Sequence, residues 1–493
     1  MHLRGRVRRK GLVSRIRIFL SGWLGLILGG CTATYAPPDL GGLYNRAAQL
    51  DDAKRNPVIV IPGILGSKLY DPRSGELVWG AFSGGAMSPD NPEGARTIAL
   101  PMEPDKRLDE LTDEVVADGA LDQVTINVFG LSLELNAYFQ ILNTLGAGGY
   151  RDRQLAEKGG IDYGEGHFTC FQFDYDWRRD IVGSAKLLHE FILARRAYVQ
   201  EEIATRYGIE NHDVKFDLVA HSMGGLVARY YLRYGPADLP EDGSLPPLTW
   251  EGARYVDRVV MIATPNAGSV SSLIELVEGN NLGPFLPRYQ PALIGTMPSV
   301  YQLLPRSRHE AVVIGVDEKT PITDIYDPAL WEKLQWGLAS PDQDDLLRML
   351  LPDVADASER RRIALDHQAK ALRRAKQFTA AIDEPASPPS GLTLHLIVGD
   401  AVPTDAVVAV NFDTGELEVI EKAPGDGTVL RTSALMDERV DGGRATRLES
   451  PIAWHRVTFL FQDHLGLTSD PTFSDNLLFL LLEQPETPKA REQ

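Results

Sequence analysis

Residues 219–226 read Val-Ala-His-Ser-Met-Gly-Gly-Leu, with a β-rich run before them and a helix-like run after them. A serine at a sharp strand-to-helix turn presents its hydroxyl at the edge of a parallel sheet. Small residues are needed two positions before and two positions after the serine because the turn is crowded, and Ala220 and Gly224 stand there. The pattern predicts Ser222 as a nucleophile whose oxyanion is stabilised by the start of a helix. The structural alternative is a serine that only caps this helix.

Strands and helices alternate on both sides of this turn. Residues 58–61 are four β-branched residues ended by Pro-Gly, and residues 258–263 and 392–398 are further apolar runs. Residues 184–207 carry apolar side chains at helical spacing. Strands that alternate with helices form a parallel sheet with helices on both faces. The sequence therefore predicts an α/β-hydrolase fold, with a mostly parallel sheet, helices on both faces, and cap and lid insertions.

Residues 62–67 (Pro-Gly-Ile-Leu-Gly-Ser) follow the first strand and are expected to form the loop that completes an oxyanion hole. The two glycines allow the backbone to fold toward the nucleophile. We expect the backbone N–H groups of Leu65 and Met223 to bind the oxyanion. One such donor contributes about 3–4 kcal/mol of transition-state stabilisation.

A serine hydroxyl needs a base because it is a poor nucleophile at neutral pH. In this fold the acid and then the histidine follow the serine along the chain. His464 stands in a loop between an apolar run and the final helix and is the expected base, with His455 as the alternative. Asp426 is the expected acid, and Asp400 is its rival, because both follow strands in glycine-containing turns. No metal ion or cofactor is expected.

The charge of the chain bears on its partners. The 493 residues are 43% hydrophobic and carry a formal net charge of -18. The first 30 residues contain seven Lys or Arg and no acid, so the remainder is more acidic still. We expect no nucleic-acid binding, because that requires a basic surface.

The N-terminus is expected to be an export signal. A basic segment precedes an apolar run at residues 18–28, and Leu-Gly-Gly-Cys then ends at Cys31. This arrangement resembles a bacterial lipoprotein signal, in which the cysteine is diacylated and becomes the first mature residue. We therefore expect an exported protein, anchored through lipidated Cys31 to a bacterial membrane on the periplasmic side or at the outer membrane. An ordinary secretory signal, or a short anchor helix, is the alternative. Cys170 lies in an apolar run and is interpreted as a core thiol.

Several stretches, in their order along the chain, resemble the lecithin:cholesterol acyltransferase family. They are residues 56–67 (Asn-Pro-Val-Ile-Val-Ile-Pro-Gly-Ile-Leu-Gly-Ser), 77–79 (Leu-Val-Trp), 174–178 (Asp-Tyr-Asp-Trp-Arg), 220–224 (Ala-His-Ser-Met-Gly), 263–269 (Ala-Thr-Pro-Asn-Ala-Gly-Ser), 402–404 (Val-Pro-Thr), 425–429 (Gly-Asp-Gly-Thr-Val) and His464. The chain departs from the family at Ala220, where some members have glycine. It also lacks, after Trp79, the cysteine-closed, tryptophan-rich membrane loop of the eukaryotic enzymes.

The resemblance implies a serine-dependent lipid acyl hydrolase or O-acyltransferase. Such an enzyme passes a fatty acyl group from a phospholipid or another lipid ester, through Ser222, to water or an alcohol. An esterase or lipase on soluble or neutral esters, and a non-catalytic lipid-binding lipoprotein, are the alternatives. The resemblance also implies a mobile lid at about residues 268–297. Asp176, Trp177 and Arg178 are interpreted as structural rather than as substrate contacts.

The expected domain organisation is a hydrolase core in two parts, separated by a charged, helix-forming stretch that we expect to be a solvated insertion. In chain order the parts are a signal peptide (1–30), a polar tether (31–56), the first part of the core (57–304) with a cap loop (80–125) and the lid (268–297), the insertion (305–388), the second part of the core (389–483) and a tail (484–493). Residues 407–412 and 416–420, on either side of Asp-Thr-Gly, predict a hairpin in the second part.

Overall fold

The computed structural model describes most of the chain beyond its N-terminus. The described residues are 38–50, 53–80, 88–120, 124–128, 131–135, 138–164, 166–281, 287–439 and 447–483. The expected signal peptide, Cys31 and the tail at 484–493 lie outside these ranges. Residues 40–493 form a unit of their own, to which all the elements below belong. In the part of the chain that is described, every helix is too short or too polar to span a membrane.

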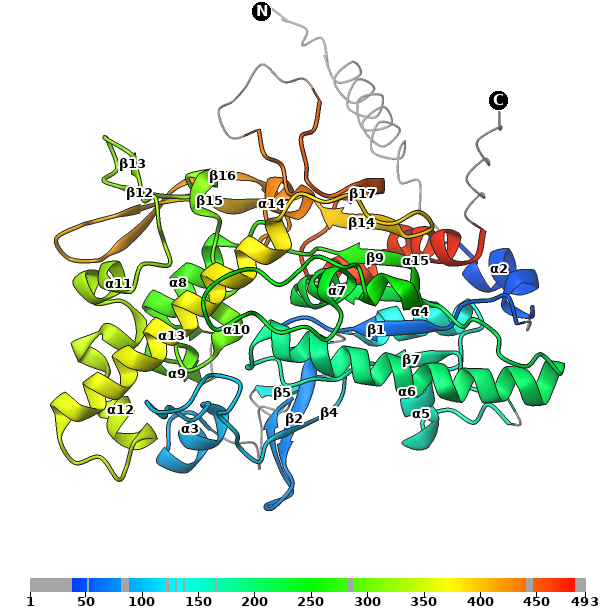
Figure 1. The fold of residues 1–493 in the computed structure, drawn as a ribbon, viewed down its shortest axis with the longest axis horizontal. Coiled ribbons are helices and arrows are strands. Elements are labelled where there is room, and N and C mark those ends of the chain that lie inside the picture. Colours follow the sequence, from blue (N-terminus) through cyan, green and yellow to red (C-terminus); the bar gives the residue numbers. More distant parts are fainter. Residues whose placement is uncertain are drawn as a thin grey trace, which may run out of the picture. The chain divides into compact units, whose positions relative to one another are not determined.

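A six-stranded sheet forms the centre of this unit (Figure 1). Its strands, in spatial order, are β17 (Trp454–Leu460), β14 (Thr393–Gly399), β9 (Val256–Ile262), β8 (Phe216–His221), β1 (Val58–Ile61) and β7 (Cys170–Gln172). All neighbouring strands are parallel. The inner strands are buried on both faces, which is why their sequences are continuous apolar runs.

Helices pack on both faces of this sheet, as the sequence predicts. The helices are α4 (Phe139–Ala147), α6 (Ile181–Tyr207), α7 (Met223–Tyr234) and α15 (Pro471–Leu478). Successive residues of a strand point to opposite faces. Ile59 and Ile61 accordingly belong to a core shared with α6 and α7, whereas Val58 and Val60 belong to one shared with α4 and α15. The α/β-hydrolase fold class is confirmed.

Smaller sheets and short helices surround this centre. The remaining strands are β2 (Ser67–Asp71), β3 (Glu76–Trp79), β4 (Val116–Ala120), β5 (Val124–Val128), β6 (Leu131–Leu135), β10 (Asn280–Asn281), β11 (Arg288–Tyr289), β12 (Val312–Ile314), β13 (Thr320–Pro321), β15 (Val402–Val410) and β16 (Leu417–Gly425). The remaining α-helices are α2 (Leu40–Ala48), α3 (Pro92–Ile98), α5 (Arg153–Glu157), α8 (Val270–Glu278), α9 (Pro291–Ile294), α10 (Pro298–Tyr301), α11 (Pro328–Leu334), α12 (Asp344–Leu350), α13 (Ala357–Asp383) and α14 (Arg431–Leu435). Single helical turns occupy Gly252–Tyr255, Ser307–His309, Gly337–Ala339, Pro341–Gln343, Gly466–Ser469 and Phe479–Glu483.

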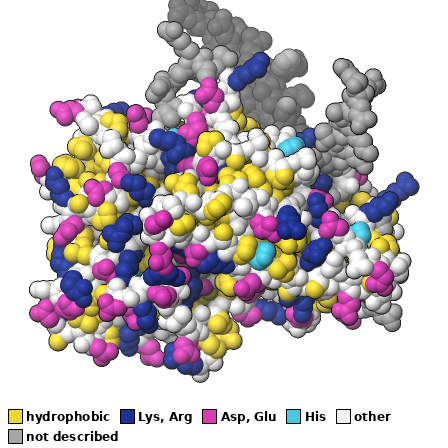
Figure 2. Space-filling model, in the orientation of Figure 1, with side chains coloured by type: hydrophobic (Ala, Val, Ile, Leu, Met, Phe, Trp, Pro, Cys, Tyr) yellow, Lys and Arg dark blue, Asp and Glu magenta, His cyan; other side chains and the backbone are white. Residues whose placement is uncertain are grey.

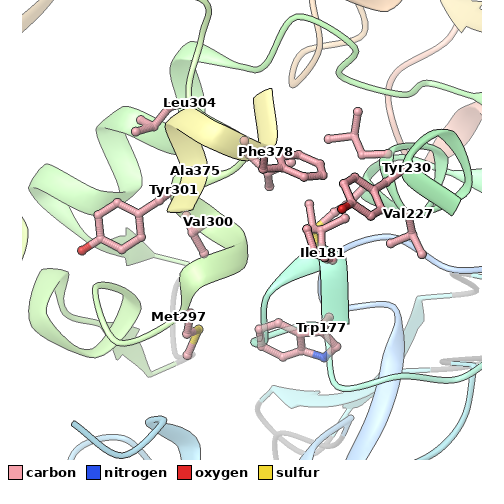
Figure 3. Packing of buried hydrophobic residues seen from close by; sticks show 14 of the residues in the cluster. Trp177, Ile181, Val227, Tyr230, Met297, Val300, Tyr301, Leu304, Ala375 and Phe378 are labelled. Carbon is pink, nitrogen blue, oxygen red and sulfur yellow. The ribbon is translucent and has the colours of Figure 1, made fainter. Parts of the chain in front are cut away.

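The charged stretch at 305–388 differs from the solvated insertion that its composition suggests. Ala364, Ala371, Ala375 and Phe378 of α13 are fully buried. The ring of Phe378 stacks on Tyr230 of α7 with centroids 5.9 Å apart, and Figure 3 shows this contact in the core. Small and apolar residues at helical spacing form one buried face, while the charged residues of α13 other than Arg360 are at least partly exposed. The expectation of a solvated stretch is therefore wrong, because mean charge hides this narrow apolar face.

Strands from the same stretch also pair with the second part of the core. β12 pairs in parallel with β15, and β15 pairs antiparallel with β16. The predicted hairpin around Asp-Thr-Gly is thus confirmed.

The segment at 268–297 contains regular structure rather than a plain loop. Leu273 and Leu276 of α8, and Leu293 of α9, are buried in the main core. Residues 282–286 lie outside the described ranges. Mobility of this segment, which the lid interpretation requires, stays a prediction.

Both signs of charge are spread over the face of the molecule in Figure 2. Lys and Arg side chains alternate there with Asp and Glu, and hydrophobic side chains gather between them.

Candidate active site

Ser222 occupies the sharp turn between β8 and α7. Its backbone angles are φ 51° and ψ -126°, in a region that a side chain makes costly. The N–H of Ser222 donates to the carbonyl of Ile262 at the end of the neighbouring strand, at 2.8 Å. This contact holds the strained residue at the carboxyl edge of the sheet, where ligands bind in open α/β folds.

The small residues around Ser222 are required by close backbone contacts. A Cβ on Gly224 would lie 2.5 Å from the carbonyl oxygens of Ile61 and Pro62. A Cβ on Gly63 would lie 2.7 Å from Cβ of Ser222. Ala220 is fully buried, so its methyl group is accommodated in place of the glycine found in some relatives. The loop after β1 and the serine turn therefore pack directly against each other.

His464 and Asp426 lie next to Ser222 and form a chain of hydrogen bonds with it. Nε2 of His464 is 3.2 Å from Oγ of Ser222, and Nδ1 of His464 is 2.7 Å from Oδ2 of Asp426. The backbone N–H of His464 also donates to the backbone carbonyl of Asp426, at 2.9 Å. The structure thus brings together the three residues that the sequence selects. With a proton on Nδ1 facing the carboxylate, Nε2 can accept the serine proton.

The Asp426 carboxylate is held in its charged form. Burial raises its pKa, but the hydrogen bond from His464 and backbone donors outweigh burial and bring the pKa below the usual value. Its Oδ1 accepts from the N–H groups of Thr428 and Val429 at 2.9 and 2.7 Å. An ionised carboxylate at this position stabilises the imidazolium form of His464.

The rival residues have other partners. Asp400 pairs with Arg431 at 2.9 Å. His455 accepts a hydrogen bond from the N–H of Leu394 in the neighbouring strand, at 3.3 Å. Neither of these contacts is to Ser222.

The expected oxyanion donors flank the nucleophile. Met223 is the first residue of α7, where backbone N–H groups lack an acceptor within the helix. Leu65 has a left-handed backbone with φ 62°, in the loop that follows β1. Such a conformation is costly for a leucine and turns its peptide away from the direction of the strand. This placement fits the expected role of both residues.

Aromatic side chains hold the oxyanion loop (residues 62–66) in place. The hydroxyl of Tyr175 donates to the carbonyl of Pro62, and Nε1 of Trp79 donates to the carbonyl of Leu65, both at 2.8 Å. Trp79 also packs edge-on against Trp177, with centroids 5.4 Å apart. Two of the stretches that resemble family motifs, 77–79 and 174–178, thus support this loop.

Tyr138 is a further contact of this loop that sequence reasoning missed. Its hydroxyl accepts a hydrogen bond from the N–H of Gly63 at 2.7 Å. Tyr138 is not part of the quoted motifs, and no local pattern marks a tyrosine that reaches a glycine 75 residues away.

The Asp-Trp-Arg triplet is structural in its contacts. Arg178 is fully buried and donates to Asp176 and Asp113, at 2.7 Å each, and to the carbonyls of Thr97 and Ile98. Burial alone would raise the pKa of Asp176, but Arg178 lowers it below its usual value. Through these contacts Arg178, which follows β7, joins the end of that strand to the cap region that contains Thr97, Ile98 and Asp113.

Apolar side chains are exposed beside His464. Phe461 is 83% exposed, the highest value among the large hydrophobic side chains of the described residues. Leu465 is 56% exposed and Phe459 47%. The three residues stand in the same stretch of the chain as His464, and exposed apolar side chains that form a patch mark contact with an apolar partner.

No three His, Cys, Asp or Glu residues of the described ranges gather in a way that would hold a metal ion. Cys170 is buried in β7, where burial first and Asp152 second raise the pKa of its thiol well above the usual value. It is a core thiol, as interpreted from the sequence.

Comparison with known proteins shows a partial match to one family and a similar fold. Residues 159–334 match the family model described as lecithin:cholesterol acyltransferase. Among solved structures, the Tle4–Tli4 complex contains a chain with 16% identity, TM-score 0.51, and coverage of 87% of this chain and 98% of that one. Lipase 1 from Pelosinus fermentans has 15% identity, TM-score 0.34, and coverage of 87% and 99%. Phospholipase PlaB from Legionella pneumophila has 14% identity, TM-score 0.28, and coverage of 66% and 54%. A search of curated protein sequences gives no significant match.

Proposed function

We propose that this chain is a lecithin:cholesterol acyltransferase-like α/β-hydrolase and that it transfers fatty acyl groups from lipid esters through Ser222. The observation that carries the proposal is the hydrogen-bonded chain from Ser222 through His464 to Asp426. A serine with a base in contact, and an acid that orients the base, is the arrangement that activates a hydroxyl for attack on an ester.

The geometry supports a two-step reaction. Oγ of Ser222 attacks the ester carbonyl while Nε2 of His464 takes its proton, and the oxyanion binds the N–H groups of Leu65 and Met223. The intermediate collapses, the ester C–O bond breaks, and His464 returns the proton to the leaving alkoxide. Water or an alcohol then attacks the acyl-serine, with His464 again as base, and releases a fatty acid or a new ester. Asp426 stabilises the imidazolium in both steps.

A lipid substrate is supported by the apolar residues beside the base. Phe461 and Leu465, which precede and follow His464 in the sequence, are exposed. A soluble ester does not require such a surface, whereas a lipid aggregate offers an apolar phase for these side chains to enter. Insertion of these two side chains into the lipid aggregate would bring the ester group of a lipid to Ser222.

We further propose that lipidated Cys31 holds the exported protein at a membrane, so that the substrate is a phospholipid or another lipid of that membrane. Cys31→Ala should move the protein from the membrane fraction to the soluble fraction of bacteria that express it. Retention of the variant in the membrane fraction would contradict the proposed anchor and would favour a membrane helix.

Phosphatidylcholine vesicles with a labelled acyl chain test the substrate class. The wild-type protein should release labelled fatty acid, or form a labelled ester when sterol or diacylglycerol is added. Ser222→Ala should do neither. If only a soluble ester such as p-nitrophenyl butyrate is turned over, the protein is an esterase. If no ester is turned over while vesicle binding is equal in both proteins, it is a lipid-binding lipoprotein.

A further inference from the structure

One buried hydroxyl, that of Tyr138, contacts both halves of the candidate site. It accepts the hydrogen bond from the N–H of Gly63 at 2.7 Å and lies 2.9 Å from Nδ1 of His221. Tyr138 is 4% exposed and His221 is 3% exposed. Gly63 belongs to the oxyanion loop, and His221 directly precedes the nucleophile, so this hydroxyl connects the two segments through one atom.

The direction of one of the two hydrogen bonds is fixed, because an amide N–H can only donate and the Tyr138 oxygen therefore accepts from Gly63. The direction of the other follows the tautomer of His221: with the ring proton on Nε2, Nδ1 is an acceptor and the Tyr138 proton points to it. Burial, and then the nearby His464, lower the pKa of His221 to about 3, so its ring is neutral at working pH.

We propose that Tyr138 is a positioning residue that fixes the distance between the Leu65 N–H and Oγ of Ser222. The inference rests on the proposed function. Gly63 lies against Ser222, since a Cβ on it would be 3.3 Å from Oγ. Leu65 is two residues further along the same loop. A displacement of about 1 Å between donor and nucleophile lowers the rate by about a hundredfold.

Other contacts of the oxyanion loop do not have this double role. Tyr175 binds the carbonyl of Pro62, and Trp79 binds the carbonyl of Leu65, but no hydrogen bond joins the hydroxyl of Tyr175 to the serine turn. Tyr138 also fills the inside of the loop, because a Cβ on Gly66 would be 2.6 Å from its hydroxyl. Loss of the hydroxyl would therefore loosen the loop and the turn relative to each other.

Steady-state kinetics of Tyr138→Phe on p-nitrophenyl butyrate test the role. We expect kcat to fall by about tenfold to a hundredfold while KM changes by less than about twofold, because the lost contact acts on the transition state. The matched control is Tyr234→Phe, which also removes a buried hydroxyl bond, to the carbonyl of Ala381 at 2.8 Å. Its kcat should stay within about twofold of wild type, with a similar loss of thermal stability. A Tyr138→Phe protein with wild-type kcat would overturn the proposal.

Substitutions at His221 test the same contact independently of the folding of Tyr138→Phe. The side-chain oxygen of His221→Asn can accept from Tyr138, whereas His221→Leu cannot. We expect kcat of the asparagine variant to be close to wild type and kcat of the leucine variant to match Tyr138→Phe. The double variant Tyr138→Phe/His221→Leu should be no worse than either single variant, since both remove one contact. Equal losses in the Asn and Leu variants, or additive losses in the double variant, would overturn the proposal. Turnover by the wild-type protein tests the proposed function itself.

Discussion

The two sides of the candidate site are built differently. On the nucleophile side, Ser222 is 7% exposed and Tyr138 is 4% exposed, and the oxyanion loop is fixed by hydrogen bonds with buried aromatic side chains. On the base side, His464 is held by Asp426, but Phe461 and Leu465 beside it are mostly exposed. Donors for a developing charge must be fixed before the reaction. A surface that meets an aggregated substrate must instead be open. We infer from the difference that the nucleophile side holds the fixed donors for the developing charge, whereas the base side combines the base His464 with residues that contact the substrate.

The largest expected effect lies at the junction of the two sides, in Asp426→Asn. The amide cannot accept the proton of His464 in the same way or stabilise its charged form, so kcat should fall by about 10⁴-fold. Asp400→Asn, which removes the pairing with Arg431, is the matched control and should change kcat by less than about threefold. Equal losses in the two variants, measured on one soluble ester, would mean that the acid is wrongly assigned.

The rigidity of the nucleophile side is tested by Gly63→Ala. Its new Cβ would lie 2.7 Å from Cβ of Ser222, so the loop or the turn must shift. We expect a loss of about a hundredfold in kcat. Gly75→Ala is the control for glycine substitution, because Gly75 has open space around it. The positive φ of 72° at this position costs the alanine variant some stability, but its kcat should stay close to that of the wild type. Similar kcat values for wild type and Gly63→Ala would show that this side tolerates displacement.

The openness of the base side is tested by Phe461→Ser. Removal of a large exposed apolar side chain should lower turnover of phospholipid vesicles by about tenfold, because its transfer into the apolar phase is lost. Turnover of p-nitrophenyl butyrate should stay within about twofold. Leu187→Ser, at a 52% exposed position on α6, is the control and should leave both rates unchanged. Equal losses on vesicles and on the soluble ester would instead place Phe461 in the chemistry.

The smallest effect is expected at Glu275 of α8, a helix whose N-cap contacts the turn that contains Asp426. The N-cap of this helix, Ser269, donates to the carbonyl of Thr428 next to Asp426. Burial raises the pKa of Glu275 to about 7. In the unfolded chain this carboxyl has a pKa of about 4.3, so below that pH it is protonated in both states and burial costs nothing. As pH rises from about 4.3 toward 7, the unfolded chain loses the proton more readily than the folded one, and the folded state loses stability. Glu275→Gln should therefore raise the free energy of unfolding by about 1–3 kcal/mol at pH 8 and leave it unchanged at pH 4. Urea unfolding at both pH values measures this, and a gain equal at pH 4 and pH 8 would contradict it.

The nucleophile side was accessible from the sequence because its constraints are local. Ser222 needs small neighbours at fixed spacing, and backbone contacts of Gly63 and Gly224 explain why only glycine fits there. Asp426 and His464 could be chosen because chain order in this fold limits the candidates. The sequence thus predicts the sheet, the turn and the three site residues.

Features that depend on distant contacts could not be predicted. Tyr138 reaches Gly63 across 75 positions, and nothing in its neighbourhood signals this. The α13 helix was expected to be solvated because its charges dominate its composition, yet Ala364, Ala371 and Phe378 bury one face. The face follows helical spacing in the sequence, but it is narrow and is made largely of alanines, so the charged composition of the stretch hides it.

Covalent labelling with a fluorophosphonate, followed by peptide mapping by mass spectrometry, tests the central claim most directly. We predict one adduct, on Ser222, that is absent in Ser222→Ala and forms much more slowly in His464→Ala, where the hydroxyl lacks its base. Labelling that persists in Ser222→Ala at the wild-type rate, or an adduct on another residue, would contradict the account.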